Sequence, residues 1–264
     1  MVWTSELISN LSIMAIAGVL VGFINTMAGG GSIISLSLLM FFGLEANIAN
    51  GTNRVAIIFQ GLSSLSVFRK NKMLDLQKGG WYFLPAIIGA IIGAFVATDL
   101  DKEVIRKAIG IVMLLMVIFI VKEPGSWLKD RPELRQKRSP WLMGFVFFMI
   151  GLYGGFVQVG VGYLLLAALV LGAGYDLVKA NAIKILITFV YTPFAFAIFI
   201  WNHQVDWYYG LALALGTFAG GWIAAHMAVK KGAGFVRWVL IIIIVITFLE
   251  SFDLIDFKNI IELF

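Results

Sequence analysis

The sequence predicts an all-α integral membrane protein made of two related halves with opposite orientations. Hydrophobic residues make up 61% of the 264 residues and charged residues 13%, and the mean hydropathy is +0.95. Soluble domains carry about 25% charged residues, so a water-soluble chain of this length could not bury so much apolar surface. The apolar runs are continuous rather than alternating, which favours spanning helices over a β-barrel. The sequence also matches itself at an offset of 131 residues, almost half the chain.

The internal match is a pattern of glycine and polar residues. Six residues of the first half fall on the same or a similar residue 131 places later: Gly29 on Gly160, Gly31 on Gly162, Gly43 on Gly174, Glu45 on Asp176, Ala49 on Ala180 and Asn50 on Asn181. Lys184 stands opposite Asn53, one place from Arg54. Each half therefore supplies one broken apolar segment and one cation.

Five apolar segments are predicted in the first half, at 7–28, 33–42, 48–68, 81–98 and 105–121. The second has ten residues and covers ~15 Å, half of the ~30 Å hydrocarbon layer. The glycines before it permit a tight connection. Residues 7–42 therefore form either two crossings or a half-depth hairpin.

The second half repeats this plan with apolar segments at 141–157, 163–171, 178–201, 207–227 and 235–249. A long polar stretch with six basic and three acidic residues separates the halves. The predicted organisation is a first membrane repeat at 1–121, a basic linker at 122–139 and a second membrane repeat at 140–264.

Orientation follows from the charged loops, since cytoplasmic loops carry the excess of Lys and Arg. The basic stretches 69–78, 122–139 and 228–237 should be cytoplasmic, and the loops 99–103 and 202–206 should face outward. Both termini are then outside. The second half starts inside where the first started outside, which predicts inverted-topology repeats whose two short broken or re-entrant segments meet near the midplane, a layout typical of transporters.

Two cations lie deep inside predicted spanning segments. Arg54 and Lys184 are each about eight residues, or ~12 Å, from the expected interface. Inserting such a cation near the centre costs at least ~2.5–3.5 kcal/mol. The alternatives are snorkelling to the interface and a structural ion pair, although the nearest acids in sequence, Glu45 and Asp176, should lie near the surface. An anionic substrate could supply the missing charge.

The glycine runs fit the same interpretation. A half-helix that begins inside the membrane exposes backbone N–H groups, and these attract anions together with the helix dipole. The alternative is helix packing through small residues. The predicted substrate-binding residues are Arg54, Lys184, Asn50, Asn53, Asn181, Gln158, Asn25, Thr26, Gly29, Gly30, Gly31, Ser32, Gly160 and Gly162. Gln60 is either structural or part of the pathway.

The sequence lacks the residues that metal binding, catalysis or ATP binding would need. The chain has no cysteine and two distant histidines, so no metal site and no cofactor are expected. No serine–histidine or paired-aspartate constellation predicts catalysis, so an enzyme is not expected. There is no GxxxxGK[ST] motif for ATP. The formal charge of +5 comes from basic loops, which indicates a bilayer rather than a nucleic acid as the partner.

These motifs together resemble the TauE/SafE family of sulfite exporters. The resemblance rests on the glycine triplet, the Gly43-Leu44 turn and the element Ala49-Asn50-Gly51-Thr52-Asn53, with a second copy after the basic linker. Asn53 stands where the family usually has serine, and Leu36 and Ala167 stand where it often has proline. The second copy, residues 180–184, lacks the Gly-Thr pair. The resemblance implies export of sulfite, sulfonates or related small organic anions across the bacterial inner membrane.

The predicted function is a secondary transporter that exports a small anion by alternating access between the two repeats. The alternatives are a passive anion channel and, with less support, an intramembrane enzyme. The membrane potential already drives an anion out, and no deep carboxylate suggests a proton carrier, which favours potential-driven or uncoupled export. The identity of the anion and a homodimeric state stay open.

Overall fold

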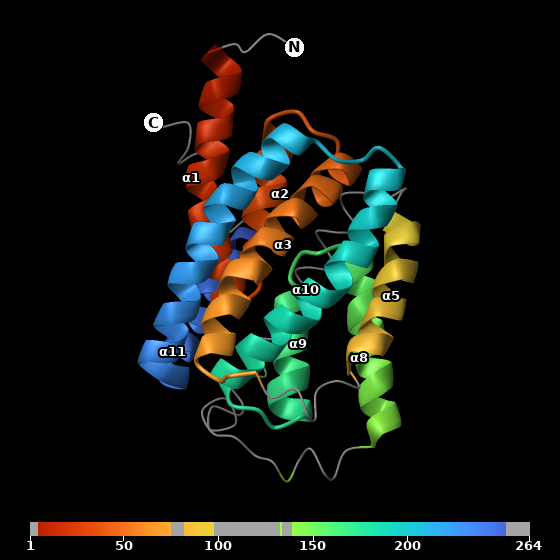
Figure 1. The fold of residues 1–264 in the computed structure, drawn as a ribbon, viewed down its shortest axis with the longest axis vertical. Coiled ribbons are helices and arrows are strands. Elements are labelled where there is room, and N and C mark those ends of the chain that lie inside the picture. The colour runs from red at the N-terminus through yellow and green to blue at the C-terminus, as the bar shows by residue number, and fades with distance from the viewer. Residues whose placement is uncertain (1–4, 75–81, 98–132, 134–138, 252–264) are drawn as a thin grey trace.

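The computed structural model describes residues 5–74, 82–97, 133 and 139–251, and this part of the chain is helical without a strand. The elements are α1 (Ser5–Met27), α2 (Ser32–Phe41), α3 (Ala46–Lys70), α5 (Phe83–Val96), α8 (Pro140–Phe156), α9 (Val161–Ala167), the π-helical segment η4 (Ala168–Gly172), α10 (Leu177–Trp201) and α11 (Trp207–Ser251). Figure 1 shows them as one bundle of roughly parallel and antiparallel helices. The all-α prediction is confirmed.

The helix boundaries agree with the predicted apolar segments to within a few residues. Within the described ranges, α1 and α10 are long and apolar enough to cross a membrane. The predicted segments 207–227 and 235–249 are joined in α11, which bends at Gly232, where φ is 75° and ψ is −175°. The predicted segment 105–121, the loop 99–103 and nearly all of the linker 122–139 lie outside the described residues. The division into 1–121, 122–139 and 140–264 stays a prediction.

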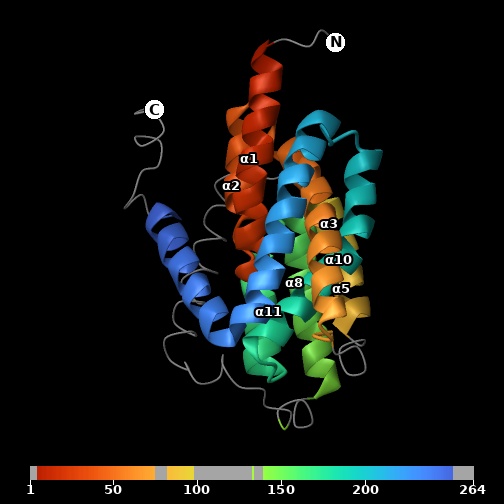
Figure 2. The same cartoon turned by 60° about the vertical axis from the view of Figure 1, so that its left-hand side comes forward.

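Each half begins with a helical hairpin. Figures 1 and 2 show α2 returning beside α1, and α9 with η4 returning beside α8. Residues 7–42 thus form a helical hairpin of α1 and α2. Because α1 alone is long enough to cross a membrane, the choice between two crossings and a half-depth hairpin stays open. In Figure 1 the first hairpin enters the bundle from the top and the second from the bottom.

The tips of the two hairpins touch through glycine backbones. A Cβ atom built on Gly162 would overlap the Cα of Gly29, and one built on Gly29 would overlap the Cα of Gly162. Gly29 also has a φ of 97°, and Gly160, its counterpart in the internal repeat, has a φ of 72°. L-residues rarely adopt such angles, so both the contact and the backbone at the tips require glycine.

The longer helices hold the hairpins by close backbone packing. α1 packs along α11, where Gly22 lies against the backbone of Thr217. α8 packs along α5, where Gly93 lies against the backbone of Leu152. These glycines are helix-packing residues of the kind common in membrane proteins. Each hairpin thus packs closely against a helix from the other half of the chain.

Three alanine substitutions separate crowding from backbone strain, two at the hairpin tips (Gly29 and Gly162) and one at Gly43, after α2. Gly43→Ala changes a residue with a φ of 91° and nothing within 4 Å of the new Cβ, so only the left-handed backbone should cost stability, on the order of 1–2 kcal/mol. Gly162→Ala has no positive φ but meets the Gly29 backbone and should cost as much or more, about 1–3 kcal/mol. Gly29→Ala combines both costs and should be the least stable. Thermal unfolding of the three variants in detergent tests this order, which a Gly43→Ala midpoint as low as that of Gly29→Ala would contradict.

Candidate functional site

The polar residues predicted to form a site are buried together in the middle of the bundle. The predicted side chains of Asn25, Thr26, Ser32, Asn50, Asn53, Arg54, Gln158, Asn181 and Lys184 are all buried. Arg54 is 0% exposed and Lys184 2% exposed. Neither cation reaches the surface of the bundle, which excludes snorkelling for both.

Arg54 on α3 binds the end of α8. Its Nη2 donates to the carbonyl oxygens of Gly155 at 2.5 Å and Gly154 at 3.4 Å, and its Nη1 donates to Gln158 Oε1 at 3.2 Å. The guanidinium carbon lies 4.5 Å from the centre of the Phe199 ring. One turn earlier on α3, Asn50 Nδ2 donates to the Phe156 carbonyl at 2.9 Å. The last three carbonyls of α8 therefore receive hydrogen bonds from α3.

Lys184 on α10 binds the end of α1 in the same manner. Its Nζ donates to the carbonyl oxygens of Asn25 at 3.0 Å and Thr26 at 2.9 Å. Asn181, one turn earlier, donates through Nδ2 to the Met27 carbonyl at 3.2 Å. The last three carbonyls of α1 thus receive hydrogen bonds from α10, as those of α8 do from α3.

These contacts show that helix C-terminal carbonyls balance part of the charge of the two cations. The last carbonyls of a helix lack intrahelical partners and carry about half a negative charge. Neither Arg54 nor Lys184 has a carboxylate partner in the described part of the chain. The sequence suggested no internal partner for either cation. The structure corrects this, because backbone carbonyls accept hydrogen bonds from both side chains.

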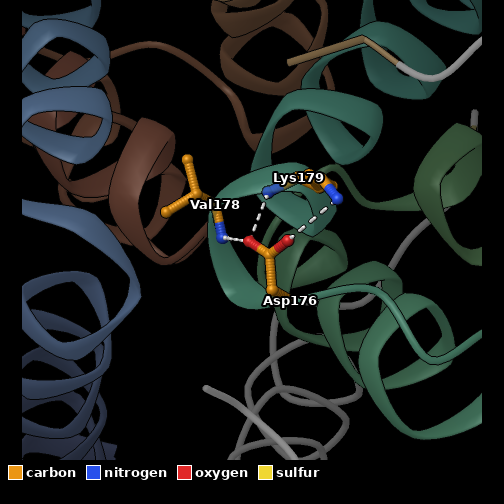
Figure 3. A network of polar contacts seen from close by, with 3 residues as sticks. All are labelled: Asp176, Val178 and Lys179. Atoms are coloured by element: carbon orange, nitrogen blue, oxygen red, sulfur yellow. Dashed lines mark hydrogen bonds and ion pairs between the residues drawn. The ribbon is translucent and has the colours of Figure 1, made fainter. Parts of the chain in front are cut away.

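Asp176 is engaged elsewhere. Its Oδ1 accepts hydrogen bonds from the backbone N–H groups of Val178 at 3.0 Å and Lys179 at 3.1 Å, and its Oδ2 lies 3.6 Å from Lys179 Nζ (Figure 3). This is an N-cap at the first turn of α10. The carboxylate therefore fixes the start of the helix that carries Lys184 and does not contact Lys184.

A small cavity lies where the hairpin tips, α3 and α10 meet. Its volume is about 30 Å³, and its wall includes Asn25, Gly29, Ser32, Gln60, Gln158, Gly162, Lys184 and Thr188, with Ile57 and Phe189 on the apolar side. Both halves of the chain contribute polar groups. A cavity of this size holds one or two waters.

The cavity includes six of the fourteen predicted site residues. Arg54, Asn50, Asn53, Asn181, Thr26, Gly30, Gly31 and Gly160 do not line it. Arg54 reaches it only through Gln158, whose side chain it binds. Thr188 was missed, because a lone threonine in an apolar helix gives no sequence signal. Gln60, left undecided by the sequence, lies on the cavity wall.

Several polar atoms around the cavity have unused hydrogen-bonding capacity. The Lys184 ammonium has three N–H donors, of which two are used. Ser32 and Asn25 bind each other, with Asn25 Nδ2 donating to Ser32 Oγ at 3.3 Å and Ser32 N donating to Asn25 Oδ1 at 3.2 Å. Gln60 Nε2 donates to Thr26 Oγ1 at 3.0 Å, while its Oε1 has no hydrogen-bond partner among the described residues. A small polar ligand would find both charge and hydrogen bonds here.

Comparison with known proteins decides the family. The family described as Sulfite exporter TauE/SafE matches residues 14–250, nearly the whole chain. The chain belongs to this family. The resemblance noted in the sequence is thereby confirmed, and the chain is a transmembrane protein of a transporter family.

Curated relatives of this TauE/SafE protein are named as membrane transporters. The "Probable membrane transporter protein" of Haemophilus influenzae is 26% identical over 88% of this chain and 90% of its own length. The "Probable membrane transporter protein ORF9" of a Sinorhizobium species is 25% identical over 88% of each chain. YunE of Bacillus subtilis, also a "Probable membrane transporter protein", is 26% identical over 88% of this chain and 94% of its own length. No solved structure matches the chain significantly. These names agree with a protein that is not an enzyme.

Removing the guanidinium should weaken the attachment of α8 to α3. Arg54→Met keeps an unbranched side chain but leaves buried carbonyls without their charged donor, which should cost about 1–3 kcal/mol of unfolding free energy. Arg54→Lys supplies a single ammonium in place of the planar fork and should fall between. The matched control is Arg69→Met, at the exposed end of the same helix. Thermal unfolding in detergent provides the measurement, and equal midpoints for Arg54→Met and Arg69→Met would refute the structural role of Arg54.

Proposed function

We propose that this protein is a secondary transporter that exports a small anion, such as sulfite, a sulfonate or a related organic anion, across the bacterial inner membrane. The observation that carries the proposal is the small cavity beside Lys184, which lies at both hairpin tips and is lined by polar groups from both halves. In this proposal the linker 122–139 is cytoplasmic and both termini are outside.

The arrangement of the two hairpins supports inverted repeats. They enter the bundle from opposite ends in Figure 1 and touch at Gly29 and Gly162. Arg54 and Lys184 make equivalent contacts, because each binds the C-terminal end of a helix from the other half. Transporters built from inverted repeats bind substrate where the repeats meet, at discontinuous helices. The midplane position of the site is part of the proposal.

The charge around the cavity supports an anion rather than a neutral or cationic substrate. Each helix end compensates about half of a unit charge, so a positive balance remains beside the cavity. Lys184 has one unused N–H, and Ser32 begins α2, whose first N–H groups favour a negative ligand. Lys184, Asn25, Ser32 and Gln158 are the proposed direct contacts. Gly29 and Gly162 line the cavity with their backbone. The remaining predicted residues do not line it and fix the helix ends and hairpin tips: Arg54, Asn50, Asn53, Asn181, Thr26, Gly30, Gly31 and Gly160.

The size of the cavity supports alternating access. Room for one or two waters is too little for a sulfonate with an organic tail, so binding requires movement of the walls. In this proposal the walls that move are the hairpin tips, which meet at Gly29 and Gly162 beside the cavity. Rocking one half against the other would open the cavity to one side at a time. A passive anion channel is the second candidate.

Transport should depend on Lys184. Lys184→Gln keeps a polar side chain but removes the charge beside the cavity, so exchange of a labelled anion in proteoliposomes should fall about tenfold or more, a typical cost for one lost charged contact. Lys179→Gln is the matched control, because Lys179 lies on the same helix with a side chain 38% exposed and paired to Asp176. Equal rates for both variants would remove Lys184 from the site. Trans-stimulated exchange by the wild type identifies a transporter, since a channel shows none.

Substrate anions should stabilise the wild type. A ligand that binds only the folded state adds ~2.7 kcal/mol of stability at a hundredfold excess over its dissociation constant. Thermal unfolding in detergent with sulfite, sulfate, taurine, sulfoacetate and carboxylate analogues should show a concentration-dependent rise for the true substrate class. The rise should be absent in Lys184→Gln and present in Lys179→Gln. A rise of equal size in Lys184→Gln would place anion binding away from this cavity.

A further inference from the structure

The two helices that end inside the bundle both point their C-terminal carbonyls at a cation that belongs to the chain. Lys184 Nζ lies 3.0 Å from the Asn25 carbonyl oxygen and 2.9 Å from that of Thr26. Arg54 occupies the end of α8 in the same way. Helix C-termini carry negative partial charge and attract cations. Both of these attractive positions are therefore already filled by side chains.

Free cations take such positions in many secondary transporters. In proteins with discontinuous helices, unwound carbonyls and half-helix C-terminal ends coordinate the Na⁺ or H⁺ that is coupled to substrate movement. The oxygen atoms that would do this at the end of α1 are bound by Lys184 and Asn181. An ion from solution would have to displace the ammonium to bind there.

We propose that Lys184 is a tethered cation that takes the place of a coupling ion at the end of α1. Transport then requires neither Na⁺ nor K⁺, and truncating Lys184 opens a binding site for a free monovalent cation. The first of these consequences rests on the proposed transport function. The second concerns cation binding alone and can be tested without transport.

Lys184 is the better of the two cations for this test because of its surroundings. It lines the cavity, whereas Arg54 does not, so an ion can enter the space left by a truncated Lys184 side chain. The carbonyl oxygens of Asn25 and Thr26 would be released, and Gln60 Oε1 on the cavity wall has no hydrogen-bond partner in the described part of the chain. Carbonyl-type oxygens replace the hydration shell of monovalent cations. Among the described residues no carboxylate lines the cavity, which disfavours divalent cations, since these bind through carboxylates.

The first experiment replaces the salt around the wild-type protein. Anion exchange is measured in proteoliposomes with Na⁺, K⁺ or N-methylglucamine as the sole cation on both sides. The expected rates agree within about twofold, below the fivefold or larger effect typical of coupling between two sites. A requirement for Na⁺ or K⁺ would overturn the proposal. If no anion is exchanged in any salt, the proposed transport function fails, and the tethered cation is decided by the second experiment.

The second experiment measures cation binding to Lys184→Ala. The thermal unfolding midpoint in detergent is followed with Na⁺, K⁺, ammonium or propylammonium, the last of which matches the group that the substitution removes. N-methylglucamine is the reference ion. The midpoint should rise in a saturable way with at least one of the small cations, and propylammonium should also restore anion exchange in liposomes. The wild type and Lys179→Ala should show no such cation-specific rise.

If Lys184→Ala does not fold, Lys184→Ser is the second variant for the same measurement. Lys184→Ser loses the same ammonium but adds a hydroxyl oxygen to the space and should show the same cation-specific rise. Absence of that rise in the folded variants would overturn the proposal. Failure of both variants to fold without a small cation, together with recovery when propylammonium is present during purification, would support it.

Discussion

The structure depends on satisfying the backbone of two helices that end inside an apolar bundle. A helix end leaves four carbonyls without intrahelical partners, and a bilayer offers no water to replace them. α1 and α8 both end in this way, and each has its last three carbonyls bound by one asparagine and one cation. The donors come from α3 and α10, so the same contacts that satisfy the backbone also join the two halves.

This constraint explains why cations are retained at such depth. A charge buried alone would be expensive, but a helix C-terminus supplies negative potential and well-placed acceptors. The balance is incomplete, because each helix end offers about half a charge. The remaining positive charge of Lys184 lies beside the cavity that this residue lines. The contacts that stabilise the helix ends therefore also leave positive charge beside the cavity.

The sequence predicted the helices and the hairpin tips well because they follow from local rules. Apolar run length sets the helices, and the repeated glycines at 29 and 160 have the positive φ values that a tight connection needs. The partners of Arg54 and Lys184 could not be predicted, because backbone carbonyls are the same at every position. Burial and charge drew attention to both cations equally, although only Lys184 lines the cavity.

Arg54 and Lys184 differ in the shape and flexibility of their charged groups, so the two halves contribute different interactions. The Arg54 guanidinium spreads its donors over Gly154, Gly155 and Gln158, and it lies against the Phe199 ring. A planar fork suits several fixed acceptors, so Arg54 serves as a rigid brace. The ammonium of Lys184 is a compact charge on a flexible stem and leaves one donor unused at the cavity. This third donor leaves the two hydrogen bonds of Lys184 to the end of α1 in place while a group in the cavity is bound. The second half therefore supplies the charge beside the cavity, and the first half supplies the brace at the end of α8.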